Sequence, residues 1–127
     1  MAAKLYCQIT GIILLIVGVL GIVGYEIKGF LSISEPAEIG LHLILGALST
    51  LAGFNGGEYS RIALWYARVF GLVYLALGIA GFAVTGGNLF LGIHLDLGCN
   101  IVHLALGVWG IYAGFFAGQE EASPATA

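Results

Sequence analysis

Four long stretches of this chain are almost free of charged residues. They run over about residues 5–25, 36–54, 61–84 and 96–117. Within each stretch the apolar residues are continuous rather than alternating, which is typical of membrane-spanning helices and not of barrel strands. At ~1.5 Å per residue, each stretch is long enough to cross the ~30 Å hydrocarbon core of a bilayer. The sequence therefore predicts four transmembrane helices.

The overall composition supports the same environment. Hydrophobic residues make up 60% of the 127 residues, charged residues make up 9%, and the mean hydropathy is +1.04, which places the chain outside the range of soluble domains. The net charge of −3 offers no basic surface for nucleic acid, and no nucleic-acid-binding motif is present. We expect an integral membrane protein that lies in a lipid bilayer and does not bind nucleic acid.

The first apolar stretch has a signal-like start, because Lys4 precedes it. However, the apolar run is too long for a secretory signal and no small-x-small cleavage site follows it, so we expect an uncleaved helix. Pro36 suits the first turn of the next helix. Residues 1–118 are then one four-helix domain, and the acidic, Pro-containing residues 119–127 are expected to form a disordered cytoplasmic tail.

The chain contains an internal repeat. HLILGALSTLAGF at residues 42–54 returns as HLALGVWGIYAGF at residues 103–115, with seven of thirteen positions identical. The first and third stretches match at an offset of sixty, and their paired residues are Tyr6 and Tyr66, Gly11 and Gly71, Gly18 and Gly78, and Gly21 and Gly81. The sequence therefore predicts an all-α bundle of two tandem transmembrane hairpins, at about residues 5–54 and 65–115. Both hairpins would enter the membrane in the same direction.

The few cations predict the orientation. Lys4, Arg61 and Arg68 fall at the start of the chain and in the middle connection, whereas the other two connections hold Lys28 beside several acidic residues. The positive-inside rule then places both termini in the cytoplasm, with the protein in the inner (plasma) membrane. The aromatic residues expected to form an interfacial belt on the cytoplasmic side are Tyr6, Trp65 and Tyr66.

The two cysteines fall at opposite ends of their helices. Cys7 lies near the start of the first stretch and Cys99 near the start of the fourth, so the thickness of the membrane separates them. Bridged Cα atoms lie within about 7 Å, so we expect no disulfide. The absence of CxxC spacing argues against a zinc site. Two small buried thiols are the prediction.

Two histidines share helix faces with small residues. Steps of three and four residues place His42 with Gly46, Ser49 and Gly53, and His103 with Gly107, Gly110 and Gly114. Small residues at this spacing let helix backbones approach closely, so both histidines are predicted to point inward. The glycines predicted to serve helix packing are Gly11, Gly18, Gly21, Gly53, Gly71, Gly78, Gly81 and Gly114.

Three interpretations of the histidine pair remain open, because polar side chains inside a membrane are costly. His42 and His103 could be axial ligands of haem b or of a chlorophyll or bacteriochlorophyll magnesium, with Gly46 and Gly107 making room for the flat ring. They could instead hydrogen-bond between or along helices, with Glu38 and Asn100 as ready partners. The third interpretation is passage of protons or a small solute.

The acidic residues near the helix starts suggest solvated helix ends. Glu38, His94 and Asp96 could bind a cation, but a hydrated helix start with Asp96 as N-cap is the leading prediction. Arg68 lies near a helix end, where its side chain can reach the interface. No nucleophile stands beside a base in a known motif, so we expect no enzyme.

Two segments of the second half, YARVFGLVYLALGIAGF at 66–82 and GCNIVHLALGVWGIYAGF at 98–115, carry a resemblance. The chain resembles a group of small bacterial four-span membrane proteins classed as a domain of unknown function. The shared feature is the Asn-x-x-His-Leu-x-Leu-Gly run at 100–107, with a weaker copy at His42. The family pattern often places an Asp before this Asn, where the present chain has Cys99. The resemblance implies four helices and no established activity or cofactor.

The leading functional prediction is a small non-catalytic accessory or assembly subunit without a cofactor. Such a protein would work by contacting other membrane proteins or its own copies. The basis is the density of glycine on helix faces, 21 in all. Four aromatic residues at helical spacing could face either lipid or a partner, and they are Trp109, Tyr112, Phe115 and Phe116.

Overall fold

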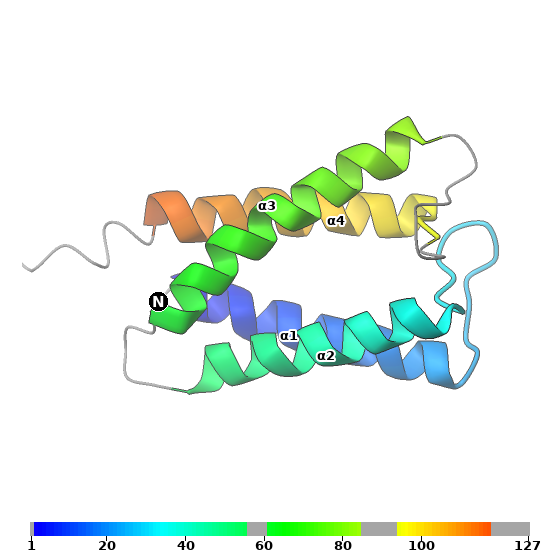
Figure 1. Ribbon diagram of the computed structural model, residues 1–127, viewed down its shortest axis with the longest axis horizontal. Helices are drawn as coiled ribbons and strands as arrows, with labels where there is room; N and C mark the ends of the chain where they lie inside the picture. Colours follow the sequence, from blue (N-terminus) through cyan, green and yellow to red (C-terminus); the bar gives the residue numbers. More distant parts are fainter. Residues whose placement is uncertain (1, 56–60, 85–93, 118–127) are drawn as a thin grey trace, which may run out of the picture.

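The computed structural model describes residues 2–55, 61–84 and 94–117 (Figure 1). Its helices are α1 (Ala2–Ile22), α2 (Pro36–Phe54), α3 (Arg61–Ala83) and α4 (Leu97–Ile111), and a π-helix, η2 (Tyr112–Ala117), continues α4. Counting α4 with η2, these are four helices long and apolar enough to cross a membrane. The predicted all-α, multi-pass membrane bundle is confirmed. The predicted turns at 56–57 and 86–88 and the tail 119–127 lie outside the described residues.

The helices form two antiparallel hairpins. α1 packs mainly against α2, and α3 packs mainly against α4. Figure 1 shows that α1 and α3 begin at the same end of the molecule, and that the far end of α3 diverges from the start of α2. A buried cluster that includes Ala3, Tyr6, Ala63 and Tyr66 joins the two hairpins where α1 and α3 begin. The hairpins are therefore joined at that end, and α2 and α3 diverge toward the other, which we call the outer end. There a second buried cluster of Ile33, Leu95 and Cys99 joins the hairpins.

Close approach of backbones holds each hairpin together. A Cβ added to Gly46 on α2 would lie 2.9 Å from the backbone nitrogen of Leu15, and one added to Gly107 on α4 would lie 2.7 Å from the Cα of Leu75. Neither position has room for a side chain. The glycines that the sequence assigned to packing are all buried. In lipid, where apolar burial gives no drive between helices, such contacts are what allow helices to associate.

The packing contacts of the first hairpin return in the second. Contacting residues on α1 recur on α3 shifted by sixty positions, and those on α2 recur on α4 shifted by sixty-one. The equivalent contacts are Gly18–Leu43 with Gly78–Leu104, Gly46–Leu15 with Gly107–Leu75, Gly53–Gln8 with Gly114–Arg68, and Gly21–Ile39 with Gly81–Asn100. The same spacing of small residues therefore produces the same helix register in both halves.

The predicted aromatic belt is wrong for both tyrosines. Tyr6 is 0% and Tyr66 is 7% exposed, whereas Trp65 is 62% exposed. The Tyr6 ring packs edge-on against Trp109, with ring centroids 5.2 Å apart. Both tyrosines lie where the hairpins meet, so they form the core of that end rather than its lipid-facing rim.

The cysteine prediction is confirmed. Cys7 and Cys99 are both free and buried. The Cys7 thiol lies in the cluster that joins the hairpins and donates a hydrogen bond to the carbonyl of Ala63, with an S···O distance of 3.5 Å. Its environment is that of a small packed side chain.

Arg68 is tied to the end of the fourth span rather than extended freely. Its Nε donates to the carbonyl of Gly114 in η2 at 2.8 Å. The guanidinium lies 5.6 Å from the ring centroid of Trp65 and 5.5 Å from that of Phe115. Hydrogen bonding and cation–π contacts thus hold this cation against the π-helix.

A glycine substitution tests the backbone contact. A Cβ on Gly71 would lie 2.7 Å from the carbonyl carbon of Gly110, whereas one on Gly40 would meet nothing within 4 Å. Both changes to Ala raise helix propensity by about 1 kcal/mol. We expect Gly71→Ala nevertheless to destabilise the protein by about 1–3 kcal/mol through overpacking, and Gly40→Ala to be neutral or stabilising. Thermal unfolding in detergent, followed by circular dichroism, measures both. Equal melting temperatures would contradict the packing argument.

Candidate functional site

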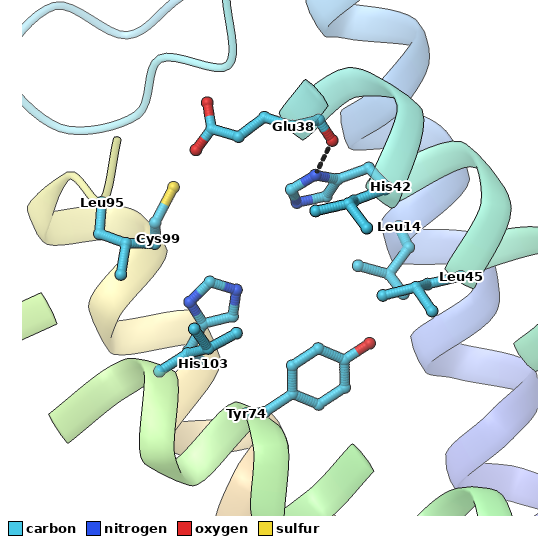
Figure 2. A pocket seen from close by; sticks show the side chains of 10 residues that line it. Leu14, Glu38, His42, Leu45, Tyr74, Leu95, Cys99 and His103 are labelled. Atoms are coloured by element: carbon cyan, nitrogen blue, oxygen red, sulfur yellow. Dashed lines mark hydrogen bonds between the residues drawn. The ribbon is translucent and has the colours of Figure 1, made fainter. Parts of the chain in front are cut away.

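Both histidines face the interior between the hairpins (Figure 2). His42 and His103 line the same cavity of about 60 Å³, together with residues from all four helices. Each is the seventh residue of its helix, α2 or α4, so the two lie at similar depth from the helix starts. The inward orientation predicted from helical spacing therefore agrees with the structure.

A second cavity of about 60 Å³ is also lined by the two histidines. Only the first cavity is lined by Leu41 on α2 and Leu77 on α3. Only the second is lined by Val17 on α1 and Val102 on α4, which stand at the equivalent positions of the two repeat offsets. The histidine pair therefore borders two cavities with related linings.

His42 bonds along its own helix. Its Nδ1 lies 2.8 Å from the backbone carbonyl oxygen of Glu38. Because a carbonyl only accepts, Nδ1 carries the proton, and Nε2 of the neutral ring is left as an acceptor. Glu38 is the partner that the sequence suggested, although the bond uses its backbone and not its carboxylate.

His103 has an unpartnered ring nitrogen. It is 9% exposed, and its Nδ1 makes no hydrogen bond to any described residue. The predicted bond to Asn100 is not formed, and the Asn100 side-chain oxygen also lacks a partner within the described chain. The ring stacks instead on Tyr74, with centroids 5.8 Å apart and planes 7° apart. Stacking fixes the plane of the imidazole while leaving its edge free.

Glu38 is buried, which corrects the prediction of a solvated helix start. The residue is 3% exposed, and the backbone N–H of His94 donates to its carboxylate. The other oxygen, Oε2, has no hydrogen-bond partner among the described residues. Figure 2 shows the side chain extending over the cavity toward Cys99 and Leu95. A carboxylate has therefore been placed inside the bundle, above the two imidazoles.

Asp96 occupies the N-cap of α4 but does not cap it. Its side chain makes no capping bond. Oδ2 accepts the backbone N–H of Ser32 at 2.7 Å, and Oδ1 lies 2.8 Å from Nε2 of His94. The neighbouring backbone bond from Gly98 N–H to the Phe30 carbonyl is 2.7 Å long. Asp96 thus fastens the loop of the first hairpin to the start of α4, at the outer end of the cavity.

The geometry around the histidines bears on cofactor binding. Gly46 and Gly107 are covered by Leu15 and Leu75, so neither opens a space beside the histidines. The cavity is also several-fold smaller than the ~300–1,000 Å³ of typical ligand pockets. Within residues 2–55, 61–84 and 94–117, no three His, Cys, Asp or Glu side chains are grouped closely enough to hold a metal ion. A tetrapyrrole would require the hairpins to move apart.

Sequence reasoning missed part of the cavity wall. Tyr74 and Cys99 line it but were not proposed as site residues. Tyr74 stands sixty positions after Leu14, which also lines the cavity, and Cys99 stands sixty-one after Glu38. Projecting each inward residue onto the other half of the repeat would have identified both positions.

Comparisons with known proteins give no assignment. No protein-family model, no curated protein and no solved structure matches this chain. The resemblance to a family of unknown function therefore stays a prediction, and the function has to be argued from the geometry of the chain itself.

Removing the Asp96 carboxylate tests its role as a fastener. Asp96→Ala deletes both side-chain contacts, so we expect a loss of about 1–3 kcal/mol of stability and faster proteolysis within residues 23–35. Glu35→Ala is the matched control, because Glu35 is the exposed N-cap of α2 and makes no side-chain capping bond. Thermal unfolding and limited proteolysis in detergent measure the difference. If both variants behave alike, Asp96 does not hold the loop.

Proposed function

We propose that this chain is a non-catalytic accessory or assembly subunit that works by binding another membrane-spanning protein or a second copy of itself. The main support is the difference in volume between the interior cavities and a groove on the surface of the protein. The interior spaces around the histidines are about 60 Å³ each, whereas a groove of about 380 Å³ lies on the outside of α3. The groove is lined by Arg61, Ile62, Trp65, Tyr66, Val69 and Phe70.

The groove suits a neighbouring helix. Its lining residues recur at intervals of three and four, so they form one continuous stripe along the first turns of α3. Ile62 is 70% and Trp65 is 62% exposed, so their side chains project from the bundle. Large exposed aromatic side chains carry much of the energy at protein interfaces. In lipid, where association depends on shape and van der Waals contact, a groove between projecting side chains favours a helix that fits it.

We place the chain in the plasma membrane of a bacterium, with both termini in the cytoplasm. Lys4, Arg61 and Arg68 belong to the end where α1 and α3 begin, and Lys28 lies in the loop at the opposite end. This distribution supports the orientation through the positive-inside rule. The bacterial membrane is taken from the sequence resemblance.

We also infer that the two hairpins arose by duplication of one. Two observations support this: the matching sequence of residues 42–54 and 103–115, and the recurrence of glycine contacts at constant offsets. Helix packing alone does not require contacts between equivalent positions at identical spacing in both halves.

Filling the groove tests the accessory role. Val69→Trp adds a large side chain to the groove floor, and Val108→Trp adds the same side chain to an exposed position of α4. We expect the wild-type protein, extracted in mild detergent, to run as a particle larger than the monomer, and Val69→Trp to lower its yield about tenfold. Val108→Trp should leave it unchanged. Size-exclusion chromatography with light scattering measures the mass. A monodisperse wild-type monomer in several mild detergents would contradict the proposal.

The second candidate is a haem or chlorophyll carrier, which the placement of His42 and His103 in one cavity favours. Because the cavity is small, we expect the purified protein to be colourless, without a Soret or chlorophyll band. An absorption spectrum decides between the two functions. A band that disappears in the His42→Ala, His103→Ala double variant, and persists in His94→Ala, would establish ligation and replace the accessory role.

A further inference from the structure

The cavity is lined by two residues whose buried polar atoms lack a partner inside the described bundle, one from each hairpin. These atoms are Oε2 of Glu38 on α2 and Nδ1 of His103 on α4, and the partly buried His42 on α2 lines the same cavity with its Nδ1 already bonded. Glu38 is 3% and His103 is 9% exposed, so bulk water does not satisfy them. A buried polar atom without a partner costs about 1–3 kcal/mol. Their convergence on one space points to a missing occupant.

Charge restricts what that occupant is. An unpaired carboxylate inside a low-dielectric bundle is strongly unfavourable, so Glu38 requires a positive partner or a proton. The chain has four Lys and Arg residues, and none of them lines either cavity. His94 contacts Asp96 through its side chain. The compensating charge therefore comes from the occupant, from a proton on Glu38 itself or from a proton on a histidine.

The volume of the cavity restricts the occupant further. A space of about 60 Å³ holds on the order of two to four water molecules, whereas a benzene-sized ligand takes a cavity of about 150 Å³. Apart from the Tyr74 hydroxyl and the Cys99 thiol, the remaining wall is apolar. It is formed mainly by Leu14, Leu41, Leu45, Leu77 and Leu95.

The hydrogen-bonding groups that line the cavity indicate whether the occupant donates or accepts hydrogen bonds. The Glu38 oxygen and the His42 Nε2 are both acceptors, because the His42 proton is used at Nδ1. His103 adds an acceptor in the tautomer that carries its proton on Nε2. A site of acceptors selects a donor, and nitrogen ligands with a single carboxylate do not suit the hard oxygen-preferring cations.

We propose that this cavity binds one water-sized cation that donates hydrogen bonds, ammonium. Glu38 supplies the counter-charge, and His42 and His103 accept hydrogen bonds from opposite hairpins. The inference goes beyond the accessory role, because it concerns the interior of the bundle and not the groove on α3. Failure of one leaves the other intact.

Titratable groups around the site are few. α1 contributes Leu14 and no titratable group. The others are Glu38 and His42 on α2, Glu35 just before α2, Tyr74 on α3, Cys99 and His103 on α4, and the His94–Asp96 pair that lies just before α4. A response to pH at the site therefore has to be assigned against this set.

The three histidines make the site observable. With ¹⁵N-histidine, the ring nitrogens of the whole protein in micelles can be followed by NMR and assigned by single His→Gln variants. NH4Cl is titrated against NaCl at constant ionic strength and fixed pH. If ammonium is the occupant, signals of His42 and His103 shift saturably with NH4Cl only, and those of His94 do not. Glu38→Gln should weaken this response at least tenfold, and Glu35→Gln should not change it.

A pH titration without ammonium provides the other arm. If a proton on the ring of His103 supplies the positive charge instead, His103 shows a protonated-ring signal in the wild type that Glu38→Gln loses at the same pH, and this result overturns the proposal. Glu38→Asp, which keeps the carboxylate, should preserve ammonium binding and guards against misfolding of the Gln variant. The proposal is also overturned if the His42 and His103 signals do not respond to NH4Cl, or if Glu38→Gln responds as the wild type does.

Discussion

Backbone contact at glycine is the interaction on which this structure depends. Helices in lipid gain nothing from hiding apolar side chains from one another, so they associate where their backbones come close. Gly46 and Gly107 remove the side chains that would keep α2 from α1 and α4 from α3. The interface between the hairpins is different, because bulky side chains such as Tyr6 and Trp109 fill one end of it. The histidine cavity lies further along this interface, where residues of two other buried clusters line it.

Much of the fold was readable from the sequence. Continuous apolar runs, Pro36 and the repeat located the four helices to within a few residues of their observed ends. Spacing by three and four placed His42 and His103 on inner faces, since a regular helix preserves that relation. Helix bounds and inward faces depend on the local sequence, so they could be predicted without knowledge of contacts between helices.

Contacts between the hairpins could not be predicted from the sequence in this way. An aromatic residue at the end of an apolar run suggests an interfacial belt, and only the neighbouring hairpin shows that Tyr6 is covered. Glu38 resembled a hydrated helix start for the same reason. The partner of Asp96 is Ser32, 64 residues away, and no helical periodicity relates the two. His103 lacks its predicted bond because its ring is drawn against Tyr74.

The two halves match at the glycine packing positions and at the histidines but differ at other positions of the cavity. His42 corresponds to His103, whereas Leu14 corresponds to Tyr74 and Glu38 corresponds to Cys99. One half therefore supplies the carboxylate and the other supplies the stacking ring. A symmetric frame thus contains an asymmetric site, and the asymmetry lies in a few side chains rather than in the arrangement of the helices.

The bond between Ser32 and Asp96 also sets an order of events during biosynthesis. The loop of the first hairpin is synthesised early, but its partner is 64 residues further along the chain. At the usual ~5–20 residues per second, the ribosome needs roughly 3–13 seconds to reach it. During that interval the loop of the first hairpin lacks this contact. The second hairpin therefore completes the first as well as pairing with it.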